Sequence, residues 1–111
     1  MQVNEYQKAA MATLNPALDK KDVLINGVMG LCGESGEAID IVKKWLMQGH
    51  EPDKKHLVRE LGDVAWYLAE AATALDVSLE AVFQGDLDKV RQRFPNGFDT
   101  GASMNRKEGD L

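Results

Sequence analysis

Four carboxylates are arranged in two pairs with helical spacing, Glu34-x-x-Glu37 and Glu60-x-x-Asp63. Residues three apart lie on the same face of an α-helix, so each pair projects both side chains in one direction. Two such helices packed antiparallel would bring all four carboxylates together. Left uncompensated, this cluster would cost several kcal/mol in repulsion and desolvation. The sequence therefore predicts a site for a hard cation with oxygen ligands, namely Mg²⁺, Mn²⁺ or Ca²⁺, and we take Mg²⁺ as the cofactor with Mn²⁺ as a substitute.

The surroundings of the two pairs strengthen this prediction, because a single E-x-x-E is common on solvated helix faces. Small residues surround the first pair, and apolar residues are interleaved with the second, unlike a solvated charged face. A ferritin-like di-iron site would need histidine at the E-x-x-H offset, and neither pair has one. Oxygen-only ligands favour magnesium.

Hydrophobic periodicity predicts the helices that carry these pairs. We expect helices over 4–14, from Asp19 or Asp22 to 48, over 53–75, and from Asp76 or Ser78 to the Pro95-Asn96-Gly97 turn. No segment shows strand-like alternation, so the fold class is all-α and four-helix-bundle-like. The expected core face of the third helix consists of Leu57, Leu61, Val64, Ala65, Leu68 and Ala72.

Glycines recur at every third position from Gly27 to Gly36 in the second predicted helix. Each costs about 1 kcal/mol of helix propensity relative to alanine. Two interpretations stay open: a bend or close helix contact, or a backbone thinned to admit a ligand.

Length and charge limit the class of protein. The chain has 111 residues and a net charge of -5, which predicts one domain over 1–98 with a polar tail over 99–111 and argues against binding a nucleic-acid polymer. No apolar run of membrane-spanning length and no secretory leader is visible, so we expect no membrane association and a cytoplasmic location. Cys32 is expected to be buried and inert.

Three segments, GLCGESGEAIDIVKKW, RELGDVAWYLA and LDKVRQRFPNGF, resemble the MazG-like all-α nucleoside triphosphate pyrophosphohydrolases over about 24–98. The family pattern is E-E-x-x-E followed by E-x-x-D, and Gly33 replaces its first glutamate here. The resemblance implies hydrolysis of a (d)NTP to (d)NMP and pyrophosphate, as in nucleotide-pool cleaning, with Mg²⁺ on Glu34, Glu37, Glu60 and Asp63. Either Glu34 or Glu37 would also orient or deprotonate the attacking water.

Several residues are candidates for holding the nucleotide. Tyr67 lies one turn beyond Asp63 on the same face, where its ring could stack on a base or sugar. The resemblance implies that Lys89 and Arg93 hold the distal phosphates, although a solvated basic face would show the same spacing. Weaker candidates are Asn26 and Asp86 for a base edge. Trp45 offers an aromatic surface, although core packing is the favoured interpretation for it. Lys44 is also weak, because its place near the end of the helix is explained by interaction with the helix dipole alone.

A chain this short leaves too small a core within one subunit to enclose a nucleotide, so we expect a homo-oligomer with helices packed across subunits. The resemblance implies that this oligomer is a homodimer or homotetramer. An alternative function is a metal-stabilised helical interaction module, or a module that binds nucleotide without hydrolysis.

Overall fold

The computed structural model describes residues 1–111 and confirms the all-α fold class. Its helices are α1 (Val3–Met11), α2 (Lys20–Gln48), α3 (Lys54–Ala74), α4 (Leu79–Arg93) and α5 (Thr100–Met104). The only β-type pairing is an isolated bridge between Pro95 and Gly97. The chain divides into two compact units, Met1–Leu79 and Glu80–Leu111, and each is described by itself. No helix combines the length and apolar character needed to cross a membrane.

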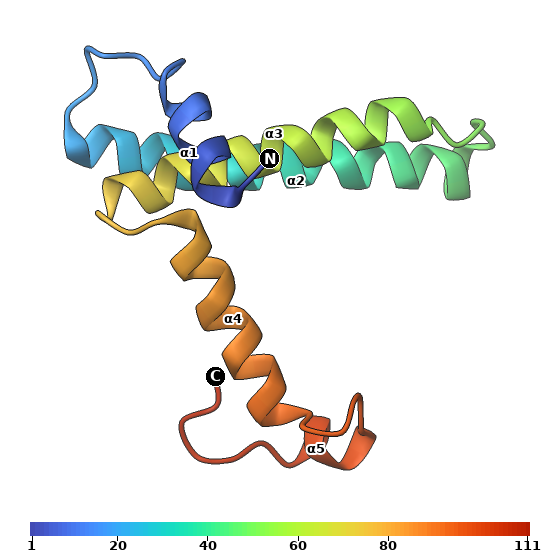
Figure 1. Ribbon diagram of the computed structural model, residues 1–111. Helices are drawn as coiled ribbons and strands as arrows, with labels where there is room; N and C mark the ends of the chain where they lie inside the picture. Colours follow the sequence, from blue (N-terminus) through green and yellow to red (C-terminus); the bar gives the residue numbers. More distant parts are fainter. The chain divides into compact units, whose positions relative to one another are not determined.

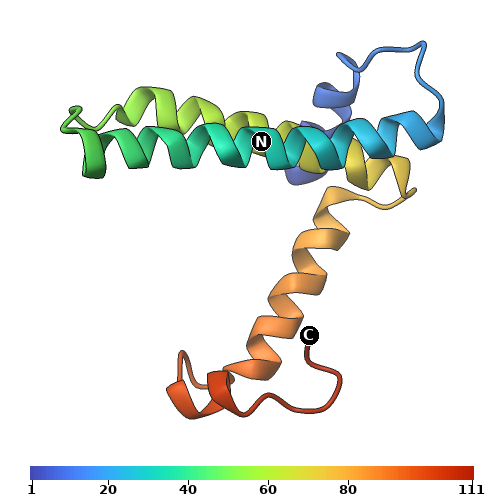
Figure 2. The ribbon, with the colours of Figure 1, turned by 180° about the vertical axis from the view of Figure 1, so that it is seen from behind.

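The first unit is built on an antiparallel hairpin of α2 and α3, which run side by side in both views (Figures 1 and 2). Capping residues mark the ends of these helices. Asp19 and Asp53 cap the two N-termini by accepting hydrogen bonds from backbone N–H groups. Gly49 ends α2 with a left-handed φ of 71°. These caps fix where the hairpin turns and thus which residues of α2 oppose which residues of α3.

Two of the four regularly spaced glycines make close helix contact, in agreement with the first interpretation. A Cβ atom on Gly27 would lie 2.9 Å from the backbone nitrogen of Ala71, and one on Gly30 would overlap the Tyr67 ring. Gly33 and Gly36 have nothing within 4 Å of such an atom. Close contact therefore explains the first two glycines, and the other two leave the backbone open beside the acidic pair.

The apolar core of the first unit is small and lies where α1 packs against α3. Ala10, Ala69 and Leu79 are buried together, and Trp66 packs against them. The Trp66 indole N–H donates to Thr13 Oγ1 at 3.0 Å, which ties this side chain to the core.

The predicted apolar face of α3 is only partly correct. Ala72 is buried, but Leu61 is 58% exposed. The reason is that α3 turns a different side toward α2, the side that carries Glu60, Tyr67 and Ala71. Hydrophobic periodicity could not show this, because small and acidic residues form much of that contact.

The expected burial of Cys32 is wrong, because this residue is exposed. It belongs to an apolar stripe along α2 whose members recur at helical spacing, on the side of the helix opposite Gly27 and Glu34. In a single chain this stripe is uncovered. Its other large members are Ile25, Val28, Met29, Ile39, Leu46 and Met47, each between 44% and 77% exposed.

The second unit contains α4 and the segment after it. Residues 99–111, expected to be a polar tail, contain α5, whose N-terminus is capped by Asp99 accepting from the Ala102 N–H at 2.7 Å. The rings of Phe94 and Phe98 pack at 5.4 Å between centroids. Periodicity does not indicate α5, because this helix is only five residues long.

Candidate metal and nucleotide site

Three of the four predicted carboxylates meet between α2 and α3. Glu34 comes from α2, Glu60 and Asp63 come from α3, and one oxygen of each lies within 4.8 Å of the others. Glu60 is the most buried, at 8% exposed, while Asp63 is open to solvent. The hairpin register brings these oxygens together, because Gly27 and Gly30 hold the helices close on the N-terminal side of Glu34.

Glu37, the fourth predicted carboxylate, is exposed and lies outside this group of three. It is nevertheless near enough for its charge to raise the pKa of Glu34. Glu37 therefore lies beside the cluster, accessible to solvent, rather than within it.

The electrostatics of the cluster fit a divalent cation. The pKa of Glu34 is raised to about 7, chiefly because its proton can be shared with the Glu60 carboxyl group, and also by desolvation and by the charges of Glu60, Asp63 and Glu37. When the carboxylates are ionised none can donate, and Oε2 of Glu60 is then buried without a hydrogen-bond partner. A divalent cation would pair with this buried oxygen, whose carboxylate belongs to the group of three.

This raised pKa predicts how the metal-free protein responds to pH. Between the unfolded pKa of Glu34, about 4.3, and its folded value of about 7, the folded state binds more protons than the unfolded state. The stability contributed by protonated Glu34 is therefore fully present below a pH of about 4.3 and is lost as pH rises through about 7.

Urea unfolding in EDTA at pH 5.5 and pH 8 would measure this effect. Relative to Glu34→Gln, which cannot ionise at this position, the wild-type protein is expected to lose stability at the higher pH. Identical pH dependence of the two proteins would contradict the raised pKa.

His56, for which the sequence indicates no chemistry, contacts the cluster directly. It lies one turn before Glu60 on α3, and its Nε2–H donates to Glu60 Oε1 at 2.9 Å, the tautomer that a carboxylate acceptor requires. The bond fixes one oxygen of Glu60 and leaves the other without a partner. The signal available in the sequence was the i, i+4 spacing of His56 and Glu60.

Two basic residues next to the cluster were also not predicted as part of the site. Lys55 and Arg59 line an open pocket of about 380 Å³ together with His56, Glu60 and Asp63. Basic residues between acids on a helix are typical of an ordinary solvated surface, so their pattern alone does not distinguish them. A polyanion approaching the cluster would meet both.

Tyr67 lies one turn beyond Asp63, as predicted, and its ring occupies the space left by Gly30. It also meets Trp66 edge to face, with 5.2 Å between ring centroids and 86° between planes. Tyr67 is only partly buried. Gly30 and Trp66 thus hold an aromatic surface beside the acidic cluster.

The weaker candidates on α2 have other partners in the single chain. The Asn26 amide donates to both carboxylate oxygens of fully buried Glu70, at 2.7 and 3.1 Å. The Lys44 ammonium lies 2.9 Å from Asp40, which raises the pKa of Lys44. Trp45 follows Glu34 by eleven residues, about 16 Å along the helix, and lines a separate apolar pocket.

The remaining candidates belong to the second unit. Asp86 and Lys89 are exposed on α4, with 3.8 Å between their charged groups. Arg93 forms a two-point ion pair with Asp110 near the end of the chain. The predicted phosphate ligands thus lie together on α4, and one of them is already engaged.

Comparison with known proteins finds a family match over the residues that form this site. The model of the MazG nucleotide pyrophosphohydrolase domain matches residues 26–98, which include all four predicted carboxylates. The Gene 37 protein of Mycobacterium phage L5 is 39% identical over 114 residues, covering 96% of this chain and 100% of that protein. No solved structure matches.

Proposed function

The chain belongs to the MazG nucleotide pyrophosphohydrolase domain family, and we propose that it hydrolyses (d)NTPs to (d)NMPs and pyrophosphate as a Mg²⁺-dependent, pool-cleaning enzyme. The observation that carries this proposal is the convergence of Glu34, Glu60 and Asp63, with a buried, unpaired oxygen on Glu60. The catalytic domain would span residues 1–98.

The residues divide between holding the cation and handling water. Glu34, Glu60 and Asp63 would hold Mg²⁺, which when bound neutralises the phosphate chain and stabilises the leaving pyrophosphate. Glu37 is exposed beside them and lies outside the group of three. It would orient the attacking water and accept its proton, with Glu34 as the other candidate for that role.

Several side chains are proposed to hold the nucleotide. Tyr67 offers a ring on which a base or sugar can stack. The basic side chains available for the phosphates are Lys55 and Arg59 beside the cluster, and Lys89 and Arg93 on α4. Asn26, Asp86, Trp45 and Lys44 remain weaker candidates for the same ligand.

The test is separation of products by anion exchange after incubation with a panel of dNTPs, NTPs and modified nucleotides, with Mg²⁺ and with EDTA. We expect monophosphate and pyrophosphate with Mg²⁺ only. Diphosphate and orthophosphate would mean that a different bond is cleaved.

A second candidate function is a helical module stabilised by metal, or one that binds nucleotide without hydrolysis. The small apolar core favours the first of these, because a cation between α2 and α3 would add to the stability of the hairpin. Loss of helicity in EDTA without turnover of any nucleotide would support it, and recovery of intact bound nucleotide would support the second.

His56 is expected to orient Glu60 for the cation. His56→Ala should weaken Mn²⁺ binding about 10- to 100-fold, as removal of a group that orients a metal ligand typically does. The measurement is titration of Mn²⁺ followed by electron paramagnetic resonance, without nucleotide. His50→Ala removes the other histidine of the chain, outside the cluster, and should leave the affinity unchanged. Equal Mn²⁺ affinity of the wild type and His56→Ala would show that His56 does not orient Glu60 for the cation.

We also propose that the protein is a homodimer or homotetramer. Met29 is 68% exposed and Ile39 is 63% exposed in the apolar stripe of α2. An uncovered apolar surface of this kind supports a second copy as its cover. A dilution series in the analytical ultracentrifuge that shows only monomer would contradict this.

A further inference from the structure

The end of the chain returns to α4 and places a carboxylate on Arg93. The Arg93 Nε–H donates to Asp110 Oδ2 at 2.8 Å, and a terminal N–H of the same guanidinium donates to Oδ1 at 2.6 Å. The two side chains are only 13% and 15% exposed. Parallel, charge-assisted bonds of this kind are among the strongest that a guanidinium makes.

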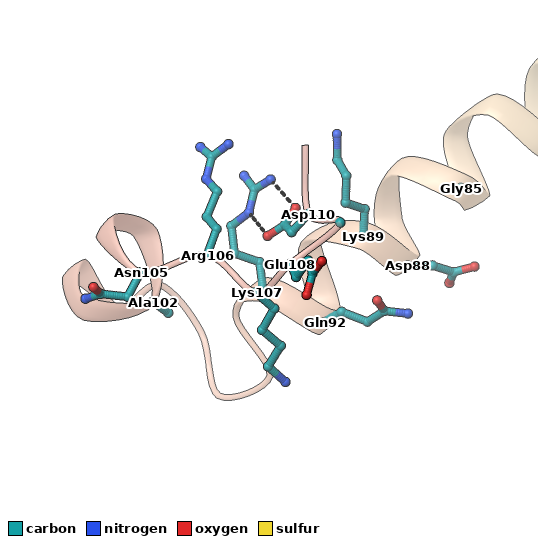
Figure 3. A pocket seen from close by; sticks show the side chains of 12 residues that line it. Gly85, Asp88, Lys89, Gln92, Ala102, Asn105, Arg106, Lys107, Glu108 and Asp110 are labelled. Atoms are coloured by element: carbon teal, nitrogen blue, oxygen red, sulfur yellow. Dashed lines mark hydrogen bonds and ion pairs between the residues drawn. The ribbon is translucent and has the colours of Figure 1, made fainter.

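Asp110 is surrounded by more than one cation. Its pKa is lowered mainly by the bonds to Arg93, and further by the charges of Arg93, Arg106 and Lys89. Figure 3 shows the Lys89 and Arg106 side chains pointing to the same side, with the Asp110 carboxylate between them in this view. These residues line one pocket of about 530 Å³.

Other acids near this pocket do not neutralise it in the same way. Glu108 and Asp88 also line it, and Asp86 lies 3.8 Å from Lys89. None of the three makes a bond to Arg93 comparable with that of Asp110. Asp110 is thus the carboxylate that pairs with Arg93 and is influenced by the charges of Arg106 and Lys89, while Lys89 also pairs with Asp86.

We propose that Lys89, Arg93 and Arg106 form one binding site for the phosphate chain of the nucleotide, and that Asp110 is its intramolecular competitor. Arg106 and Asp110 lie beyond the residues matched by the family model, so neither role follows from the family. The proposal rests on the proposed function, because that function supplies the phosphate chain.

The Asp110 carboxylate and a phosphate group bind the Arg93 guanidinium in the same way. Carboxylate and phosphate both accept two parallel N–H bonds from arginine. A tethered carboxylate acts at an effective concentration in the millimolar range, so it competes with free phosphate esters but yields to a chain that engages several cations at once. Small anions with one phosphate group are therefore excluded more strongly than a triphosphate.

The test compares Asp110→Asn with Glu108→Gln, which removes a carboxylate from the same pocket without touching Arg93. Binding of inorganic pyrophosphate and of tripolyphosphate is measured by calorimetry in EDTA, and KM and kcat for a nucleotide are measured with Mg²⁺. Asp110→Asn is expected to bind both anions several-fold more tightly and to lower KM with kcat unchanged. Glu108→Gln should change these quantities by less than half as much, and Arg106→Ala should weaken anion binding.

Two outcomes overturn the proposal. Unchanged anion affinity in Asp110→Asn would mean that Asp110 does not compete, and weaker affinity would mean that it positions Arg93 instead. Absence of nucleotide turnover together with tighter anion binding by Asp110→Asn would contradict the proposed function and leave the anion site and its competitor standing.

Discussion

Asp63→Asn is expected to lower kcat/KM by about 10³-fold, or roughly 4 kcal/mol of transition-state stabilisation at about 1.36 kcal/mol per tenfold change. The substitution keeps the size of the side chain and removes one of the three charges that converge between α2 and α3. It leaves the helix hairpin intact because Asp63 is exposed and contributes no core packing. Initial rates at saturating Mg²⁺, with Mn²⁺ affinity measured separately, would quantify the loss.

Glu51→Gln is the matched control for charge. Glu51 lies in the exposed connection between α2 and α3, so its neutralisation changes the net charge equally without reaching the cluster. It should alter kcat/KM by less than about twofold, as expected for a surface substitution. A loss below tenfold in Asp63→Asn would show that this carboxylate is not part of the catalytic cluster.

Gly27→Ala is expected to reduce the free energy of unfolding by about 2 kcal/mol, because the clash it introduces outweighs the gain in helix propensity. A Cβ atom there meets the backbone of Ala71 at 2.9 Å, and backbone cannot move aside as a flexible side chain can. Overpacking of this kind costs about 1–3 kcal/mol, and we expect the upper end of that range here. The alanine recovers only about 1 kcal/mol of helix propensity.

Gly33→Ala, on the same helix, is expected to change the free energy of unfolding in the opposite direction. Its Cβ atom would meet nothing within 4 Å, so the gain of about 1 kcal/mol in helix propensity should appear undiminished. Urea unfolding of both variants in EDTA, at one protein concentration, measures the difference. Equal stability changes would contradict the close packing of α2 on α3 at Gly27.

Local signals in the sequence were sufficient for the helices. Asp19 and Asp53 cap a helix through their own side chains, and Gly49 ends a helix because glycine tolerates a left-handed backbone. The packing of α3 was not predictable in the same way. Leu61 fits the apolar period, yet the side of α3 that faces α2 includes Glu60, whose burial depends on residues of another helix.

In the candidate site, too, features set by local spacing could be predicted, whereas features set by the packing of distant residues could not. Helical spacing correctly indicates that Glu60 and Asp63 share a face, but the separation of Glu37 from the other three depends on the hairpin register. The contact of His56 with Glu60 depends on the side-chain rotamer of His56. The pairing of Arg93 with Asp110 joins residues seventeen apart in sequence, and no local pattern indicates it.

Gly30 and Tyr67 have a consequence for how this protein can change over evolution. Any side chain at position 30 would overlap the Tyr67 ring. A larger residue at position 30 can therefore be accepted only after Tyr67 has been replaced by a smaller residue. Divergent copies of this chain should therefore change both positions together.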